Sequence, residues 1–401
     1  MLTFENNKIT YNYSQCQQCG VCEAVCPKCA ITMKFISNGT HEVLVDNDIC
    51  IKCQKCVKCC PANKKVKDQG YFQKFRLASY YFGFNKDEKI RSKCSSGGTC
   101  KTLIIDSLKQ GLVDGVYTLK RLESYPSGEG AFFTKNNIPT YDDLANSVYH
   151  SVMIGTNIKT VQFCNRLMIV GTSCQLRALE VALKGKYKEL IKVCIFCKQQ
   201  KTLESTRFLT KAMGYKIPEN LNFSTRYRGN GWPGIVRVGE AELPWNRAAQ
   251  LPFGRRLWTV PGCNVCGDPF GMECEVDITL MDPWKIRTTN ELGETLVTVH
   301  TERGNSLLHQ CENLVLENKE YEEVKPALGL DDVWRKRMLV PFFRGDTSDD
   351  VILRAGNAEQ KQRRILQAMA MKLPRLPFIF YRIMCRFPDL RNKILKYKDE
   401  H

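Results

Sequence analysis

The strongest chemical signal in the sequence is a cysteine spacing that occurs twice. The pattern C-x2-C-x2-C-x3-C-P is formed first by Cys16, Cys19, Cys22 and Cys26 with Pro27, and again by Cys50, Cys53, Cys56 and Cys60 with Pro61. Three thiolates at this spacing wrap one face of a four-iron cubane, and the proline ends the loop and redirects the fourth cysteine. The repeat predicts two [4Fe–4S] clusters.

Residues 1–65 resemble a bacterial two-cluster ferredoxin domain, in which the fourth cysteine of each run ligates the other cluster. The expected ligand sets are therefore Cys16, Cys19, Cys22 and Cys60 for one cluster, and Cys50, Cys53, Cys56 and Cys26 for the other. Two alternatives stay open. Paired cysteines also bind structural zinc, although the repeated triple is more specific for iron, and Cys59 could replace the adjacent Cys60. Cys29 has no predicted role.

Four further cysteines could form a third thiolate set. Apolar strands are predicted over residues 167–170 and 190–196, each followed by a helical pattern, so Cys174 and Cys197 would lie at the carboxyl ends of two parallel strands. Cys263 and Cys266 form a C-x2-C knuckle. Spacing alone leaves two alternatives: buried structural cysteines, or a redox dithiol of Cys194 and Cys197.

A small-residue turn precedes another predicted helix. The segment Ser95-Ser96-Gly97-Gly98-Thr99 comes before an amphipathic pattern that ends at Gly111. Small residues at a helix start let backbone N–H groups approach an anion, so the turn is a candidate phosphate site. An ordinary helix cap explains the same residues equally well.

Composition excludes several classes of protein. The chain has 401 residues, 43% of them hydrophobic, and no run of 18 apolar residues, so neither disorder nor a membrane span is expected. Its 21 cysteines and its polar N-terminus without a signal peptide favour a reducing compartment, so we expect a cytoplasmic protein. No G-x-G-x-x-G motif supports NAD(P)H binding, and the five histidines support no hydrolase triad.

The charge balance and the C-terminal segment bear on partners. A net charge of +17 would attract an acidic partner such as a ferredoxin. The tail carries basic residues beside the aromatic stretch 378–387, which is too short to cross a bilayer. That stretch could lie at the inner face of an anionic membrane, dock a partner, or belong to a helix packed on the core. No motif indicates nucleic-acid binding.

Residues 90–340 resemble the coenzyme F420 hydrogenase/dehydrogenase β-subunit family, which binds FAD and a [4Fe–4S] cluster. The resemblance implies a third cluster on Cys174, Cys197, Cys263 and Cys266, and FAD contacts from Ser96, Gly97, Gly98, Thr99, Ser147 and Tyr149. The segments that carry it are 96–98, 111–115, 147–149, 171–175, 196–197, 228–232, 263–268 and 323–330.

The predicted fold class is α+β and α/β. The expected domains are a two-cluster ferredoxin domain (1–65), a linker (66–89), an α/β domain for FAD and a cluster (90–340), and a basic tail (341–401). The predicted function is an iron–sulfur flavoprotein oxidoreductase that moves electrons, in a direction left open, between an organic substrate such as coenzyme F420 and a ferredoxin or another redox protein. The alternatives are a reductase of a polysaccharide or tetrapyrrole intermediate, a non-catalytic electron-transfer subunit, and a zinc-stabilised binding module. No catalytic residue is predicted.

Overall fold

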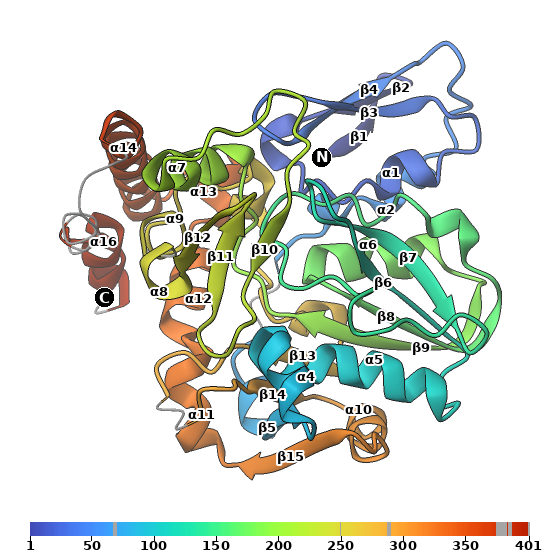
Figure 1. The fold of residues 1–401 in the computed structure, drawn as a ribbon. Helices are drawn as coiled ribbons and strands as arrows, with labels where there is room; N and C mark the ends of the chain where they lie inside the picture. The colour runs from blue at the N-terminus through green and yellow to red at the C-terminus, as the bar shows by residue number, and fades with distance from the viewer. Residues whose placement is uncertain (67–69, 249, 287–289, 374–382, 384–386, 400–401) are drawn as a thin grey trace.

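An eight-stranded mixed sheet forms the centre of the structure (Figure 1). The structure is a computed structural model that describes residues 1–66, 70–248, 250–286, 290–373, 383 and 387–399. The strand order is β15-β5-β14-β13-β9-β8-β6-β7. The strands are β5 (Ser79–Asn85), β6 (Gly115–Arg121), β7 (Gly128–Thr134), β8 (Cys164–Gly171), β9 (Tyr187–Ile195), β13 (Ile278–Met281), β14 (Thr295–Val299) and β15 (Leu314–Lys319).

The parallel part of this sheet matches the predicted strand and helix alternation. β8 pairs in parallel with β6 and β9, and β9 pairs in parallel with β13. Each predicted helix follows its strand, as α6 (Ser173–Ala182) and α7 (Leu203–Met213). The strands are almost wholly buried because their side chains face apolar layers on both sides. The mixed α/β class and the parallel pairing of these strands are thus confirmed.

The other part of the sheet is antiparallel and begins earlier than the sequence suggested. β5 pairs with β14 and β15, yet it lies inside the range 66–89 that we expected to be a linker. Its Tyr-Tyr-Phe-Gly-Phe run supplies aromatic side chains that pack beneath the sheet, while the lysine-rich residues before it masked this signal. Three helices accompany these strands: α4 (Glu88–Lys93), α5 (Thr99–Lys109) and α10 (Glu302–His309).

The N-terminal region consists of two short hairpins, each associated with a cysteine run. β1 (Leu2–Glu5) pairs with β2 (Lys8–Tyr11), and β3 (Ile31–Phe35) pairs with β4 (His41–Val45), both antiparallel. A short helix lies within each run, α1 (Val21–Ala24) and α2 (Lys55–Cys59). The small core of this region draws on buried strand residues and includes Cys56. Figure 1 places the region against the strand-and-helix body near α6.

A smaller sheet and a group of helices complete the fold. β10 (Thr225–Tyr227), β11 (Ile235–Val238) and β12 (Ala241–Pro244) form an antiparallel sheet. The remaining helices are α3 (Lys74–Leu77), α8 (Trp245–Ala248), α9 (Gln250–Gly254), α11 (Tyr321–Leu328), α12 (Leu330–Met338), α13 (Val340–Arg344), α14 (Asp350–Lys372) and α16 (Leu390–Asp399).

The described parts of the tail are helices packed on the body. α14 buries Leu366 and Ala370 against the core that includes α7 and α8, and α16 buries Leu395 against α14. Most of the aromatic stretch 378–387 lies outside the described residues. Within the part of the chain that the structure describes, no helix combines the length and apolarity that crossing a membrane requires.

Candidate functional site

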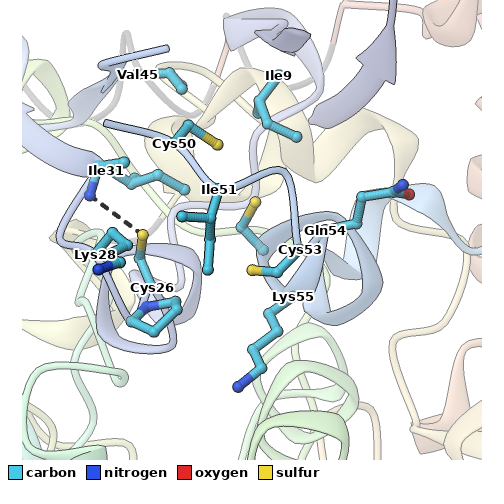
Figure 2. A pocket seen from close by; sticks show the side chains of 13 residues that line it. Ile9, Cys26, Lys28, Ile31, Val45, Cys50, Ile51, Cys53, Gln54 and Lys55 are labelled. Atoms are coloured by element: carbon cyan, nitrogen blue, oxygen red, sulfur yellow. Dashed lines mark hydrogen bonds between the residues drawn. The ribbon is translucent and has the colours of Figure 1, made fainter. Parts of the chain in front are cut away.

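Four cysteines of the N-terminal region surround a pocket, and we refer to them as the outer set: Cys26, Cys50, Cys53 and Cys56. The pocket holds about 360 Å³ of empty space, part of it open to solvent. Figure 2 shows Cys26, Cys50 and Cys53 around Ile51. Backbone N–H groups of Ala30 and Lys52 donate to two of the sulfurs, at 3.2 and 3.4 Å. The crossed ligand set predicted from the spacing is thus assembled around one space.

The other four predicted ligands, the inner set, lie together deeper in the molecule: Cys16, Cys19, Cys22 and Cys60. Burial raises the pKa of the Cys19 thiol well above its usual value, and the sulfurs of Cys22, Cys60 and Cys16 raise it further. Burial and Cys16 likewise raise the pKa of Cys22. Buried thiols with raised pKa values ionise readily only when a cation binds them. Iron would supply that charge.

The two neighbouring cysteines outside the pattern have different surroundings. Cys59 is buried, and its thiol donates to the Cys56 carbonyl at 3.4 Å. Burial raises the pKa of Cys59, and the nearby sulfurs of Cys19 and Cys60 raise it further, so Cys59 also lies near the inner set. Cys29 is exposed. The positions of Cys59 and Cys60 therefore fit either residue as the fourth ligand of the inner set.

The third predicted set, Cys174, Cys197, Cys263 and Cys266, also gathers in one place. Burial raises the pKa of Cys174, with further contributions from Cys266, Cys197 and Cys263. Burial brings the pKa of Cys197 to about 12 and that of Cys263 to about 11. The Gln200 backbone N–H donates to the Cys263 sulfur at 3.2 Å. Two strand ends and one knuckle, distant in sequence, thus present four thiols to one volume.

The inner set and the third set are in direct backbone contact. A Cβ atom added to Gly262 would lie 2.1 Å from the carbonyl oxygen of Cys16, so these two backbones touch. On the other side of the inner set, the Gly155 N–H donates to the Cys19 carbonyl at 3.0 Å. Since Gly262 directly precedes Cys263, the second and third thiol sets are neighbours. Of the three sets, only the outer one contains an exposed cysteine, Cys53.

Two other cysteines near the third set belong to a polar network and a core. Cys274 is buried, and its sulfur accepts a hydrogen bond from the Arg177 Nε at 3.0 Å. Arg177 also pairs with Asp268 at 2.9 Å. Cys194 is fully buried on β9 in the apolar core beside α6. The redox dithiol of Cys194 and Cys197 stays a prediction without further support.

The predicted phosphate turn has an uncommon backbone. Ser96, Gly97 and Gly98 have φ values of 49°, 76° and 82°, directly before helix α5. A Cβ at Gly97 would lie 2.6 Å from the Gly293 carbonyl oxygen, so no side chain fits there. Thr99 is fully buried, and its hydroxyl has no hydrogen-bond partner in the described residues. A turn of this kind fits the approach of a phosphate-bearing group to the helix start.

The other residues assigned to FAD by resemblance lie beside this turn. The Ser147 N–H donates to the Ser95 hydroxyl at 3.2 Å. Tyr149 stacks on Trp245 with ring centroids 5.1 Å apart. Burial raises the pKa of Tyr149, the nearby Arg228 opposes this, and Cys197 of the third set contributes to the rise. The Lys201 N–H donates to the Tyr149 carbonyl at 2.8 Å, and the N–H of its neighbour Gln200 donates to the Cys263 sulfur, so Tyr149 and the third set are adjacent.

Sequence reasoning gave no role to a buried ion pair at this place. Arg228 is 1% exposed and donates to Asp282 at 2.9 Å, and the Ser96 hydroxyl donates to the same carboxylate. The Arg228 guanidinium also lies over three tryptophan rings, at 4.6 to 5.2 Å: Trp232, Trp245 and Trp284. The charged and aromatic residues of this site are visible in the sequence segments 228–232 and 282–284, but neither segment indicates that it will contact the other.

The donor sets fit clusters. Within the described residues, no group of three or more His, Cys, Asp or Glu side chains is close enough to hold a single metal ion. Each thiol set has instead four cysteine sulfurs, the ligand number of a [4Fe–4S] cluster. Small-residue backbone at the start of a buried helix likewise fits FAD, whose pyrophosphate needs N–H donors.

Two family models match this chain, and both describe the beta subunit of coenzyme F420 hydrogenase/dehydrogenase. The model of its N-terminal part matches residues 80–137, and the model of its C-terminal part matches residues 164–324, together more than half of the chain. No curated protein matches. A chain in a xenon-derivatised structure of the F420-reducing [NiFe] hydrogenase complex from Methanosarcina barkeri is similar at 17% identity and a TM-score of 0.46, covering 67% of this chain and 90% of that chain.

Proposed function

This chain belongs to the coenzyme F420 hydrogenase/dehydrogenase beta subunit family, and we propose that it is an oxidoreductase that moves electrons between [4Fe–4S] clusters, FAD and an organic substrate. The first candidate substrate is coenzyme F420, which the family description names. Reduction of a polysaccharide or tetrapyrrole intermediate is the alternative. The protein partner that exchanges electrons with the clusters in this proposal is a ferredoxin or another redox protein.

One observation carries the proposal: the inner and third four-cysteine sets are in backbone contact, and the third set adjoins Tyr149 through the neighbouring residues Gln200 and Lys201. The outer and inner sets would hold two clusters, and the third set would hold another. FAD, when bound, supplies the exchange between single electrons and electron pairs. The chain's own contribution is to hold the Ser96 turn through Asp282 and Arg228, and to exclude water from it with tryptophan rings.

The proposal predicts a defined cofactor content. Protein purified without oxygen should hold about one FAD and about twelve irons, four for each thiol set. Cys263→Ala should lower the iron content by about four per chain. The matched control is Cys311→Ala, because Cys311 is equally buried but lies in the apolar core outside every set. Colourless protein with zinc and no iron would contradict the proposal.

The flavin site has its own matched pair of variants. Gly97→Ala and Gly111→Ala both place alanine at a positive φ, 76° and 68°, so both bear a similar backbone strain. Only Gly97 faces a backbone oxygen at 2.6 Å, whereas Gly111 has open space. We expect Gly97→Ala to lose bound FAD while Gly111→Ala retains it. Equal FAD content in the two variants would exclude the turn from the flavin site.

The substrate is tested on the same preparation. Oxidation of reduced F420 under anaerobic conditions, with an artificial one-electron dye as the acceptor of its two electrons and followed by absorbance, should proceed with the isolated protein if F420 is the substrate. A protein that contains both cofactors but changes F420 only after a partner is added would be an electron-transfer subunit. Full cofactor content without any reaction with F420 would favour the polysaccharide or tetrapyrrole alternative.

A further inference from the structure

Of the three cysteine sets of the proposed electron route, the outer set contains the one exposed member, Cys53. Cys53 is exposed, whereas Cys19 of the inner set is only 8% exposed and its backbone is bonded to Gly155 of the body. The third set also lacks an exposed cysteine: Cys263 is 8% exposed, and Cys174, Cys197 and Cys266 are half-buried. A macromolecule that exchanges electrons with this chain therefore has its shortest approach at the outer set.

The surface around the outer set combines apolar and basic side chains. Ile49 and Ile51 are 49% and 55% exposed, although both precede ligand positions of the second cysteine run. Lys28, Lys52 and Lys55 are also exposed. Two of these lysines line the pocket itself, and Figure 2 shows Lys28 and Lys55 near Cys26 and Cys53.

The acidic side chains nearby, Asp46 and Asp48, cancel only part of the charge of the three lysines. Asp46 and Asp48 precede the run, and the Asp46 carboxylate accepts N–H groups of Asp48 and Ile49, so it is engaged in its own turn. Among the described residues, no ion pair joins either carboxylate to Lys28, Lys52 or Lys55 at 4.0 Å or less. The face keeps an excess of positive charge around exposed apolar groups, which is the composition of a protein docking site with electrostatic steering.

We propose that this face, formed by Lys28, Ile49, Ile51, Lys52 and Lys55, is the docking site of an acidic one-electron carrier protein. The inference rests on the proposed function, because a carrier protein would bind here only if electrons enter or leave through the outer set. The basic rim orients an acidic partner, and Ile49 and Ile51 make the apolar contact at the centre. The partner's redox group is then brought beside the most accessible cysteine set.

Binding tests the proposal independently of turnover. The probe is a small acidic two-cluster ferredoxin, titrated calorimetrically into the full-length protein at low and at high ionic strength. Neutralising the rim, Lys28→Gln with Lys52→Gln and Lys55→Gln, should raise the Kd by about tenfold or more at low ionic strength, and much less at high salt, because exposed charges are screened. The single variant Ile51→Ser should weaken binding at both salt concentrations.

The control replaces three exposed lysines elsewhere by glutamine: Lys89 on α4, Lys109 on α5 and Lys135 after β7. Figure 1 shows α4 and α5 far from the N-terminal strands. This variant has the same net charge as the rim variant and should bind the ferredoxin as the wild type does. Equal weakening in both triple variants, or equal binding of an acidic protein of similar charge without a redox group, would overturn the proposal.

The same samples separate this proposal from the proposed function. Iron and FAD are assayed on every variant, and reduction by dithionite, which needs no docking, is followed by absorbance. Full cofactor content with no loss of ferredoxin binding in the rim variant refutes the docking site alone. Absent iron and flavin refute the proposed function, whereas the calorimetric comparison of the charge variants still reports whether the face binds the acidic carrier.

Discussion

The contact between Gly262 and Cys16 gives the sharpest test of how the N-terminal region meets the body. Both Gly262 and Gly254 have an ordinary φ, so alanine introduces no backbone strain at either position. At Gly262 the new methyl would lie 2.1 Å from the Cys16 carbonyl oxygen and 2.2 Å from its carbon, whereas at Gly254 nothing lies within 4 Å. Since real Cβ contacts start at 3.0 Å, the two backbones must separate by about 1 Å.

Such overpacking costs about 1–3 kcal/mol, which corresponds to a decrease of about 2–4 °C in Tm for each kcal/mol. The assay is thermal unfolding of anaerobic holoprotein at one fixed scan rate, because Tm depends on scan rate when unfolding is irreversible. We expect Gly262→Ala to unfold several degrees below the wild type and Gly254→Ala to match it. Identical Tm values for all three proteins would show that the two backbones do not touch in solution.

Three further predictions address cysteine roles and pH. Cys60→Ala should lower the iron content by about four per chain while Cys59→Ala keeps it; the reverse result would exchange the two as ligand. Cys274→Ser should retain all the iron, because its sulfur accepts a hydrogen bond from Arg177 that a serine hydroxyl can also accept; a loss of four irons would make it a ligand. His150 is 1% exposed, and burial lowers its pKa to about 3, from about 6.5 in the unfolded chain. Its neutral form favours folding above pH 6.5, and about 1.4 kcal/mol is lost for each pH unit below that value. His150→Gln should therefore lose less Tm than the wild type between pH 7 and pH 5, and equal losses would contradict the burial argument.

Local pattern was sufficient wherever chemistry or burial repeats along the chain. The apolar runs near 167–170 and 190–196 predicted β8 and β9 and their parallel pairing, because strands buried on both faces have continuous apolar sequences. The doubled cysteine spacing predicted which thiols the structure brings together, although their role as cluster ligands stays a prediction. Each of these two patterns spans few residues and consists almost entirely of one type of residue, apolar in the strands and cysteine at fixed spacing in the runs.

Long-range association was not predictable in the same way. Arg228 and Asp282 are 54 residues apart, and nothing in either segment indicates that the guanidinium and the carboxylate will share a buried site. β5 was placed in a linker because the lysine-rich residues before it masked its aromatic run. These features depend on which elements become neighbours, and one sequence contains no direct record of that.

A contact near the C-terminus has a consequence for biosynthesis. The Arg363 guanidinium on α14 donates to the Asn264 side chain at 2.9 Å, within the knuckle between Cys263 and Cys266, and the two residues are 99 positions apart. The ribosome must therefore release about a hundred residues beyond the knuckle before this hydrogen bond can form. The cysteines of the outer and inner sets all lie between residues 16 and 60. Their two clusters can therefore be inserted while the rest of the polypeptide is still being translated.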